Sequence, residues 1–422
     1  MQIGHGLALT SASVVLSFIP VILSVPTVMG LFAHLRCYRN IVACLDQDPA
    51  RPAVKLMTAG TLLSELEAAV GRRDLHTARW RSVAFNAATW TVKEQEHLSL
   101  GYCLTAVTLL HLFAAPGSHF GAMGVEVAAQ TLWRLSGTDA SRALLVPTDV
   151  VALLASLLRA PASTGAAIKC CNVLVQLALR DDMEEAAVAH GAHRHAIWHL
   201  EATTELPAAL QRIDASAAWA RLLAIITFAE ANKRAAHASG ALPVVLRALA
   251  PGSQLAQHPQ TAQCLVQVVQ HLTVSSDAAR VEAVSCGAVQ ACVALLTGVL
   301  GSNEDVVATS LSVLHECVAL PAHVLPAIHA GALAAVLTRV EHPTLPGSTP
   351  RALTYAVRVL GYVSRSPDGV PALAADGLRA VRVVAALGCS TVTAVRDGAV
   401  VEAVAWTTAQ LREAGLAIVA PL

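Results

Sequence analysis

The stretch Asn232–Leu249, NKRAAHASGALPVVLRAL, places a glycine between two apolar stripes. One stripe ends at Ala238 and the next begins at Leu242, so Gly240 interrupts a pattern that would otherwise suit one helix. A glycine inside a single helix costs about 1 kcal/mol relative to alanine. Two short helices that meet at a sharp turn need such a residue, because glycine tolerates the turn and lets the backbones approach closely. We therefore predict two helices with Gly240 at the corner between them.

The same pattern returns along the chain. Related stretches carry a glycine at the same place, namely Gly191, Gly287, Gly331 and Gly377. With Gly240 included, the successive intervals are 49, 47, 44 and 46 residues. Extending the register backwards, at steps of 43, 47 and 41 residues, reaches Thr148, Gly101 and Gly60. A shared period of this length indicates a repeat architecture, in which each unit buries its apolar face against its neighbours.

A longer segment follows each pair of short helices. Three examples are TAQCLVQVVQHLTV (261–274), DVVATSLSVLHECVAL (305–320) and RALTYAVRVLGYVS (351–364). Apolar residues recur in them at steps of three and four, which is typical of a helix with one buried face. No stretch alternates with period two for long enough to predict a strand. The sequence therefore predicts an all-α protein built from three-helix units.

A short first helix, a small-residue turn and two further antiparallel helices resemble the armadillo repeat family. The resemblance covers residues 50–411 and is strongest from Asn232 to Leu411; the motif A-x-x-x-G-A-[LV]-x-x-[LV]-[LV] occurs at Ala236 and, with Cys292 at its second-last position, at Ala283. HEAT repeats are the nearest alternative, and they lack the glycine-turned short helix. The resemblance implies a right-handed α-solenoid of about seven repeats. We expect this array over 50–411, a hydrophobic segment over 1–49 and a partial repeat over 412–422.

The amino-acid composition limits the classes of partner that the protein is expected to bind. The chain has 422 residues, 29 basic and 29 acidic side chains, and 55% apolar residues. A neutral net charge argues against a nucleic-acid partner, which normally leaves a basic footprint. Ten cysteines occur without a C-x-x-C pair, which favours reduced, buried thiols in a cytoplasmic protein.

The first 35 residues contain no Lys, Arg, Asp or Glu. The apolar run Leu7–Leu35 is long enough for a membrane span of about 20 residues. Arg36 and Arg39 follow it, which would leave the repeats on the cytoplasmic side. A partial first repeat interrupted at Pro20 and Pro26 explains the same residues, and a cleaved signal peptide is a third possibility. The partial repeat, the membrane anchor and the signal peptide stay open.

Other apolar stretches bear on the membrane question and on self-association. The charge-poor runs Leu98–Val125, Ala283–Asn303 and Cys317–Thr338 are interpreted as pairs of short buried helices, because the repeat register places corners at Gly287 and Gly331 in the last two. The C-terminal stretch EAGLAIVAPL (413–422) resembles the start of another repeat. Solenoids normally need polar caps, so an uncapped apolar end would be covered by a partner, by a membrane or by self-association.

Motifs for catalysis are missing. The sequence contains no phosphate-binding G-x-x-x-x-G-K-[ST] loop, no dinucleotide G-x-G-x-x-G and no nucleophile-elbow G-x-S-x-G. The nearest candidate site is the stretch HGAHRHAIWHLE, with His190, His193, His195, His199 and Glu201. His195 and His199 are four residues apart and could share a helix face with a metal, although no third ligand is defined. We expect no cofactor, no metal and no enzymatic activity.

Candidate binding residues come from the resemblance. Armadillo arrays present their third helices along a concave groove, and in the importin-α branch these helices carry Trp and Asn four residues apart. Carried over by register, the pattern falls on Asn172 and Gln176, Leu223 and Thr227, Gln267 and His271, Ser312 and Glu316, and Arg358 and Tyr362. None of these pairs is Trp and Asn, which argues against binding of nuclear import signals.

Three functional hypotheses follow. The first is a non-catalytic scaffold that binds a segment of a partner protein along the groove, through Asn172, Gln176, Thr227, Gln267, His271, Ser312, Glu316, Arg358 and Tyr362. The second is an adaptor tethered to a membrane by residues 7–35. The third is a metal-dependent enzyme built around the histidines of residues 190–201. The missing catalytic motifs favour the scaffold.

Overall fold

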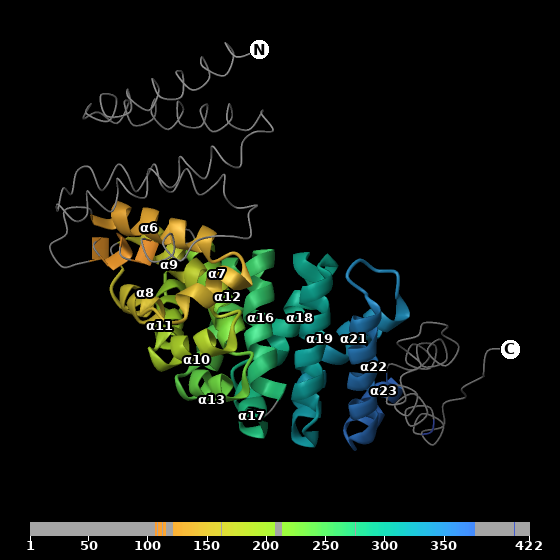
Figure 1. Ribbon diagram of the computed structural model, residues 1–422. Helices are drawn as coiled ribbons and strands as arrows, with labels where there is room; N and C mark the ends of the chain where they lie inside the picture. The colour runs from red at the N-terminus through yellow and green to blue at the C-terminus, as the bar shows by residue number, and fades with distance from the viewer. Residues whose placement is uncertain are drawn as a thin grey trace, which may run out of the picture. The chain divides into compact units, whose positions relative to one another are not determined.

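The computed structural model describes residues 106–107, 109–111, 113–114, 121–161, 163–206, 213–274, 276–375 and 409, and every regular element in them is a helix (Figure 1). The expectations for residues 1–49 and 412–422, and the corners at Gly60, Gly101 and Gly377, lie outside these residues. The chain divides into two compact units, Met1–Gln176 and Leu177–Leu422.

The first unit contains one complete set of three helices in its described part. Helix α6 (Gly121–Leu135) comes first and is followed by α7 (Asp139–Leu145), α8 (Val150–Arg159) and α9 (Thr164–Leu177). The Thr138 side chain caps α7 by accepting a hydrogen bond from the backbone N–H of Ser141 at 3.2 Å. The axes of α7 and α8 differ by 83°. The turn between them contains Thr148, where the repeat register predicts a corner.

The second unit repeats the same three-helix order. The first helices are α10 (Asp181–Ala189), α13 (Glu230–Ala238), α17 (Asp277–Ser285) and α20 (Val324–His329). The second helices are α11 (Ala192–Thr204), α14 (Ala241–Ala248), α18 (Ala288–Thr297) and α21 (Ala332–Glu341). The third helices are α12 (Ile213–Ile226), α16 (Pro259–Val274), α19 (Glu304–Val318) and α22 (Pro350–Arg365). Short connections are α15 (Gln254–Gln257), η2 (Val299–Ser302) and η3 (Pro321–His323), and α23 (Gly369–Ala375) follows α22.

A glycine in the left-handed region precedes each of the four second helices of this unit. The φ angles are 77° at Gly191, 78° at Gly240, 88° at Gly287 and 86° at Gly331. Each glycine is the N-cap of its second helix. The bend is sharp, since the axes of α17 and α18 differ by 68° across Gly287. The predicted corners at these four glycines are confirmed.

The third helices form a continuous layer in the second unit. Helix α16 packs between α12 and α19, and α19 packs between α16 and α22 (Figure 1). Each third helix also packs on the second helix of its own repeat, through the pairs α11–α12, α14–α16, α18–α19 and α21–α22. The contacts are made by fully buried side chains such as Leu265, Val268, Leu311 and Leu314, each of which contributes about 1.5–3 kcal/mol. The predicted all-α solenoid of three-helix repeats is confirmed.

Two buried charged side chains tie successive repeats together. Glu184 of α10 accepts hydrogen bonds from the Asn232 side chain at 2.8 Å and from the backbone N–H of Ala229 at 3.3 Å. It thereby satisfies a free N–H group at the start of α13, where Ala229 has no side-chain cap. Arg339 of α21 donates to the backbone oxygens of Leu296 and Gly301 at 2.7 Å and to that of Pro346 at 2.9 Å. Arg339 therefore holds the α18–α19 connection against the α21–α22 connection.

No single helix of the described residues has the length and apolar character needed to cross a membrane. Three bent helix pairs meet these criteria only when the two helices are taken together. One of them is the α17–α18 pair, whose corner lies inside the run Ala283–Asn303. Its 68° bend confirms the prediction of two short helices for that run. The run Leu7–Leu35 lies outside the described residues.

The described cysteines are free, and most of them are buried. Cys170, Cys171, Cys264, Cys292 and Cys317 are buried, whereas Cys286 is exposed. Burial raises the pKa of the Cys170 and Cys317 thiols to about 12. The expectation of buried thiols holds for these five and is wrong for Cys286.

His193 of α11 is a polar group enclosed in the core. Its exposed fraction is 3%, and neither ring nitrogen has a hydrogen-bond partner in the part of the chain that the structure describes. Burial, together with the charges of Arg194 and His195, lowers the pKa of His193 to about 4. The imidazole is therefore neutral at pH 7, and the core carries the cost of an unsatisfied polar group.

A series at Gly240 tests the corner. A Cβ at this position would meet no atom within 4 Å. Any loss of stability would therefore come from the strain of a side chain on a left-handed backbone and not from a steric clash. We expect Gly240→Ala to lower the free energy of unfolding by about 1–2 kcal/mol, Gly240→Asn to lower it less and Gly240→Val to lower it more. Urea unfolding measures the series, with Ala231→Val at an exposed position of α13 as the control. Equal stability of Gly240→Val and the wild type would contradict the corner.

His193→Leu tests the buried imidazole. Between pH 6.5 and pH 4 the unfolded chain takes up a proton on His193 that the folded chain does not, so the free energy of unfolding falls as the pH falls. The loss from this residue is on the order of 3 kcal/mol. We expect His193→Leu to raise the free energy of unfolding at pH 7 and to remove this part of the pH dependence. Urea titrations at several pH values measure both effects, and a variant with the wild-type pH slope would refute the assignment.

Candidate peptide-binding surface

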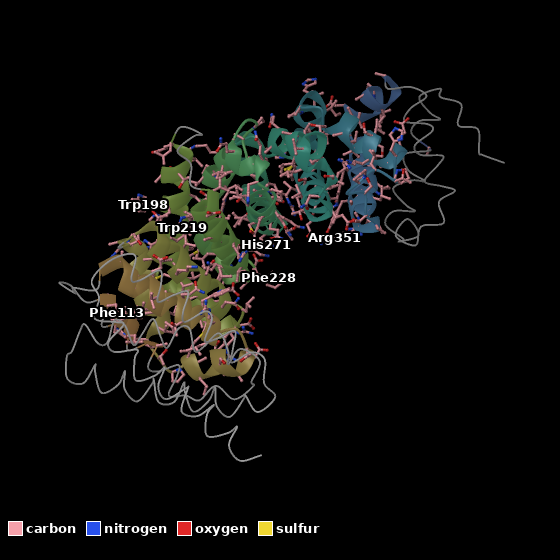
Figure 2. The ribbon with its side chains drawn as sticks, turned by 90° about the horizontal axis from the view of Figure 1, so that it is seen from above. Phe113, Trp198, Trp219, Phe228, His271 and Arg351 are labelled. Carbon is pink, nitrogen blue, oxygen red and sulfur yellow. The ribbon has the colours of Figure 1, made fainter. Side chains whose placement is uncertain are left out.

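The third helices of the second unit leave one face partly exposed. We call it the third-helix surface, and it comprises Arg221, Ile225, Phe228, Gln263, Gln267, Gln270, His271, His315, Glu316, Arg351, Tyr355, Arg358, Tyr362 and Arg365. Within each helix these residues recur mostly at steps of three and four, so they share one side of it. Figure 2 shows Phe228, His271 and Arg351 along one side of the array, whereas Trp198 of α11 lies on the other.

His271 of α16 packs against the C-terminal end of α12. Its Nδ1 lies 3.1 Å from the hydroxyl oxygen of Thr227, and its ring meets the ring of Phe228 edge-on at 5.8 Å between centroids. Burial and the nearby charge of Lys233 lower the pKa of His271 to about 4, so the ring is neutral at pH 7. The Phe228 side chain is 74% exposed. His271 therefore supports the surface, and Phe228 is the larger exposed group beside it.

The structure shifts the predicted register in α12 by two residues. Thr227 is fully buried, and its hydroxyl donates to the backbone oxygen of Leu223 at 2.8 Å. Thr273 of α16 is equally buried and makes the same bond to Val269 at 2.9 Å, so Thr227 corresponds to Thr273. The α12 residues that correspond to Gln267 and His271 are then Arg221 and Ile225. Leu223 and Thr227 lie inside the array, because the connections before the third helices differ in length between repeats.

Glutamines of α16 lie beside α19. Gln270 donates to the hydroxyl oxygen of Ser312 at 2.8 Å, and Gln263 donates to a carboxylate oxygen of Asp305 at 3.0 Å. Ser312 is buried, with 2% of its surface exposed. Gln267 is half-buried between the two linking glutamines. Ser312 therefore joins two helices, whereas Gln267 presents an amide at the surface.

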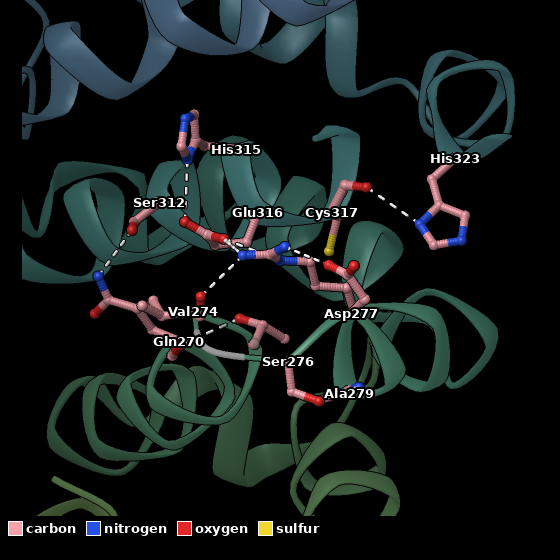
Figure 3. A network of polar contacts seen from close by, with 12 residues as sticks. Gln270, Val274, Ser276, Asp277, Ala279, Ser312, His315, Glu316, Cys317 and His323 are labelled. Carbon is pink, nitrogen blue, oxygen red and sulfur yellow. Dashed lines mark hydrogen bonds and ion pairs between the residues drawn. The ribbon is translucent and has the colours of Figure 1, made fainter. Parts of the chain in front are cut away.

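Glu316 belongs to an ion-pair network rather than to an open binding site (Figure 3). Its Oε2 accepts hydrogen bonds from Arg280 of α17 at 2.7 and 3.1 Å, and its Oε1 lies 3.2 Å from Nδ1 of His315. Burial alone would raise the pKa of Glu316, but the hydrogen bond and charge of His315 and the charge of Arg280 lower it below its usual range. The carboxylate is ionised at pH 7 and already paired.

Helix α22 contributes aromatic and basic side chains. The ring of His315 lies 5.2 Å from that of Tyr362 and 5.9 Å from that of Tyr355, measured between centroids. Arg358 and Tyr362 are half-buried, and Arg351 is exposed. The predicted pair of Arg358 and Tyr362 therefore lies on the surface, next to residues that the sequence did not single out.

The remaining predicted residues, Asn172 and Gln176, lie four residues apart on α9 in the first unit, and both are half-buried. They share one side of α9. The structure thus leaves seven of the predicted residues at least partly exposed, namely Asn172, Gln176, Gln267, His271, Glu316, Arg358 and Tyr362, and buries Thr227 and Ser312.

Histidines of α11 pack against aromatic side chains or lie in the core. The ring of His199 stacks on that of Trp219 at 4.4 Å with a 5° interplanar angle, and Trp198 meets it edge-on at 4.6 Å. His193 points into the core, with 3% exposure. Among the residues that the structure describes, no three His, Cys, Asp or Glu side chains come together in a way that could hold a metal ion.

The sequence pattern missed Phe228, Tyr355 and Arg351. Phe228 follows directly after the last turn of α12, where an apolar residue is normally expected to be buried. Tyr355 and Arg351 lie outside the four-residue pairs carried over from the family. A count of the polar and aromatic residues on one side of 350–365 could have found the last two.

Comparisons with known proteins identify the fold alone. No family model and no curated protein match the chain. An engineered protein of known crystal structure is 16% identical, with a TM-score of 0.65 over 93% of this chain and 87% of its own. A computationally designed armadillo repeat protein for modular peptide recognition is 15% identical, with a TM-score of 0.50 over 61% of this chain and 99% of its own. A second designed armadillo repeat protein is 14% identical, with the same TM-score and coverage.

Since the sequence identities are low, the similarity concerns the fold and not the residues of the surface. The chain has an armadillo-like repeat fold.

Proposed function

We propose that this protein is a non-catalytic scaffold that binds a segment of a partner protein on the third-helix surface. The observation that carries the proposal is the exposed Phe228 side chain, 74% accessible, whose ring meets His271 of α16, one helical turn from the half-buried Gln267 on the same helix. An aromatic anchor provides a large contact area at low conformational cost. A nearby amide can pair with the backbone of a bound segment, which would otherwise lose hydrogen bonds to water.

The way in which the side chains of the third-helix surface pack favours a binding function over a catalytic one. His271 is neutral and hydrogen-bonded to Thr227, and Glu316 is paired with Arg280, so neither is available as an acid or base. The third helices are rigid elements packed side by side, and groups fixed on such elements need little reordering when a ligand binds. A designed protein of the same fold is described as made for modular peptide recognition, which supports a peptide ligand in general terms.

The place of action in this proposal is the cytoplasm. The alternative, an adaptor tethered through Leu7–Leu35 with its repeats facing the cytoplasm, concerns residues outside those that the structure describes. Self-association through the chain ends is a further alternative, and the residues at both ends also lie outside those that the structure describes. Removal of residues 1–40, followed by fractionation of cells into membrane and soluble material, separates the tethered form from the untethered one.

Peptide selection tests the binding surface. Short random peptides displayed on phage are selected on the full chain, and the affinities of the selected peptides are measured by fluorescence polarisation. We expect the double change Phe228→Ala and Gln267→Ala to weaken them about tenfold or more, because it removes an aromatic anchor and a backbone partner. Melting curves check that the variant is folded.

Trp198→Ala is the matched control, because Trp198 is an exposed aromatic residue, 56% accessible, on the other side of the array (Figure 2). We expect this change to leave the affinities as they are. Selected peptides that lose affinity with Trp198→Ala and keep it with the double change would place the binding surface on the second helices and refute the proposal.

A further inference from the structure

The two ring nitrogens of His271 have different surroundings. Nδ1 lies 3.1 Å from the hydroxyl oxygen of Thr227. That hydroxyl donates its proton to the backbone oxygen of Leu223 at 2.8 Å, so towards His271 it can only accept. The backbone oxygen of Ala224 lies 3.3 Å from the same hydroxyl oxygen, on the Nδ1 side of the ring, and its hydrogen bond with His271 favours the protonated nitrogen. Both neighbours of Nδ1 are thus acceptors, and the proton of the neutral imidazole is on Nδ1.

Nε2 of His271 is consequently a hydrogen-bond acceptor. A neutral imidazole with its proton on Nδ1 carries a lone pair on Nε2. Nε2 forms no hydrogen bond with any residue that the structure describes and, unlike the two ring nitrogens of His193, is not enclosed in the core. Burial and the charge of Lys233 lower the pKa of His271 to about 4, so Nε2 is unprotonated at pH 7 and can accept a hydrogen bond from a ligand.

Apolar side chains lie beside this acceptor. The ring of Phe228, which is 74% exposed, meets the imidazole edge-on at 5.8 Å between centroids, and Figure 2 shows the two residues next to each other. Val274, 44% exposed, follows His271 by three residues on the same side of α16. A ligand side chain with an apolar body and one polar tip suits such a surface, because the surface offers apolar contact and a single acceptor.

The charge near the acceptor favours a neutral donor. Lys233 of α13 pairs with Glu230 at 3.0 Å, and its positive charge is, after burial, the second cause that lowers the pKa of His271. A lysine or arginine of the ligand would bring another positive charge to the same place. The indole N–H of tryptophan and the phenolic O–H of tyrosine are neutral donors, and each belongs to an aromatic side chain that can pack on Phe228.

We propose that Nε2 of His271 accepts a hydrogen bond from a tryptophan or tyrosine side chain of the bound segment while the ring of that side chain packs on Phe228, an assignment that rests on the binding function proposed above. A phenylalanine at this place makes the ring contact but leaves Nε2 desolvated without a partner, so it binds more weakly. Gln267, one turn before His271, keeps its role as a partner for the backbone of the segment.

The test uses the same displayed random peptides, selected on the full chain. Peptides that bind are expected to be enriched in tryptophan and tyrosine over phenylalanine, relative to the starting library. A tryptophan methylated on its indole nitrogen keeps the ring and loses the donor, and a change of tyrosine to phenylalanine removes the O–H. Either replacement in a selected peptide is expected to weaken its binding to the wild type about tenfold, measured by fluorescence polarisation.

Two variants of His271 separate the acceptor from the packing. In His271→Asn the amide reaches the place of Nδ1 and can donate to Thr227, but no atom takes the place of Nε2. In His271→Gln the amide reaches the place of Nε2 and its oxygen can accept there. We expect His271→Asn to weaken the unmodified peptides about tenfold and to leave the donor-free peptides unchanged, whereas His271→Gln retains part of the affinity. Equal weakening of both kinds of peptide by His271→Asn would show a loss of packing and overturn the proposal.

His329→Asn is the matched control, because it makes the same substitution at an exposed imidazole of α20, outside the third-helix surface. It is expected to leave every affinity, and the effect of removing the donor, as in the wild type. Circular dichroism melts check that the three variants are folded.

The outcomes separate this proposal from the proposed function. Selected peptides that depend on Phe228 and Gln267 but show no preference for tryptophan or tyrosine would keep the binding function and overturn the role of His271. Peptides that are weakened by His271→Asn but not by loss of the side-chain donor would place a backbone N–H at Nε2 and overturn the side-chain assignment. Failure to select any peptide on the folded wild type would overturn both proposals.

Discussion

A backbone turned into the left-handed region at one residue sets the direction of the second helices in the second unit. Gly191, Gly240, Gly287 and Gly331 all adopt this conformation, and each ends one short helix and begins the next. A residue with a Cβ would add about 1–2 kcal/mol of strain at such a position. The four φ angles lie between 77° and 88°, so the chain enters each second helix through a similar backbone turn. The third helices can then pack side by side.

Polar contacts between repeats keep this stacking in register. Glu184 caps α13 from the preceding repeat, and Arg339 binds backbone oxygens in two connections. Both side chains are mostly buried, so their charges are costly unless each is fully hydrogen-bonded. Glu316 is paired with Arg280 in the same way, and the hydrogen bond between Thr227 and the neutral ring of His271 joins α12 to α16. These contacts fix where one repeat lies against the next, and the groups that make them are consequently unavailable to a ligand.

What remains on the third-helix surface is therefore a smaller and different set than the family pattern implies. Phe228 is left exposed and Gln267 half-buried, so these two side chains remain accessible to a ligand. Whether a residue is accessible to a ligand depends on how deeply its side chain is buried between the helices. Residues whose side chains point between neighbouring third helices make contacts inside the array. Other residues of the same helices, at neighbouring positions on the helix surface, face the solvent. A four-residue spacing alone does not distinguish the two, because both classes recur at helical intervals.

The sequence by itself determined the helices, the glycine corners and the repeat length, because these depend on local spacing and on the special backbone freedom of glycine. It also placed Gln267, Arg358 and Tyr362 on third helices. Only the tertiary structure decided which of the candidate residues are accessible. Thr227 and Ser312 were predicted as contacts and are buried, since connections of unequal length shift the register of α12 and since Gln270 reaches across to Ser312. Phe228 is exposed although it is apolar, and it lies in the short turn between α12 and α13. The physical reason is general to such arrays: helix formation is local, whereas burial depends on the neighbouring repeat.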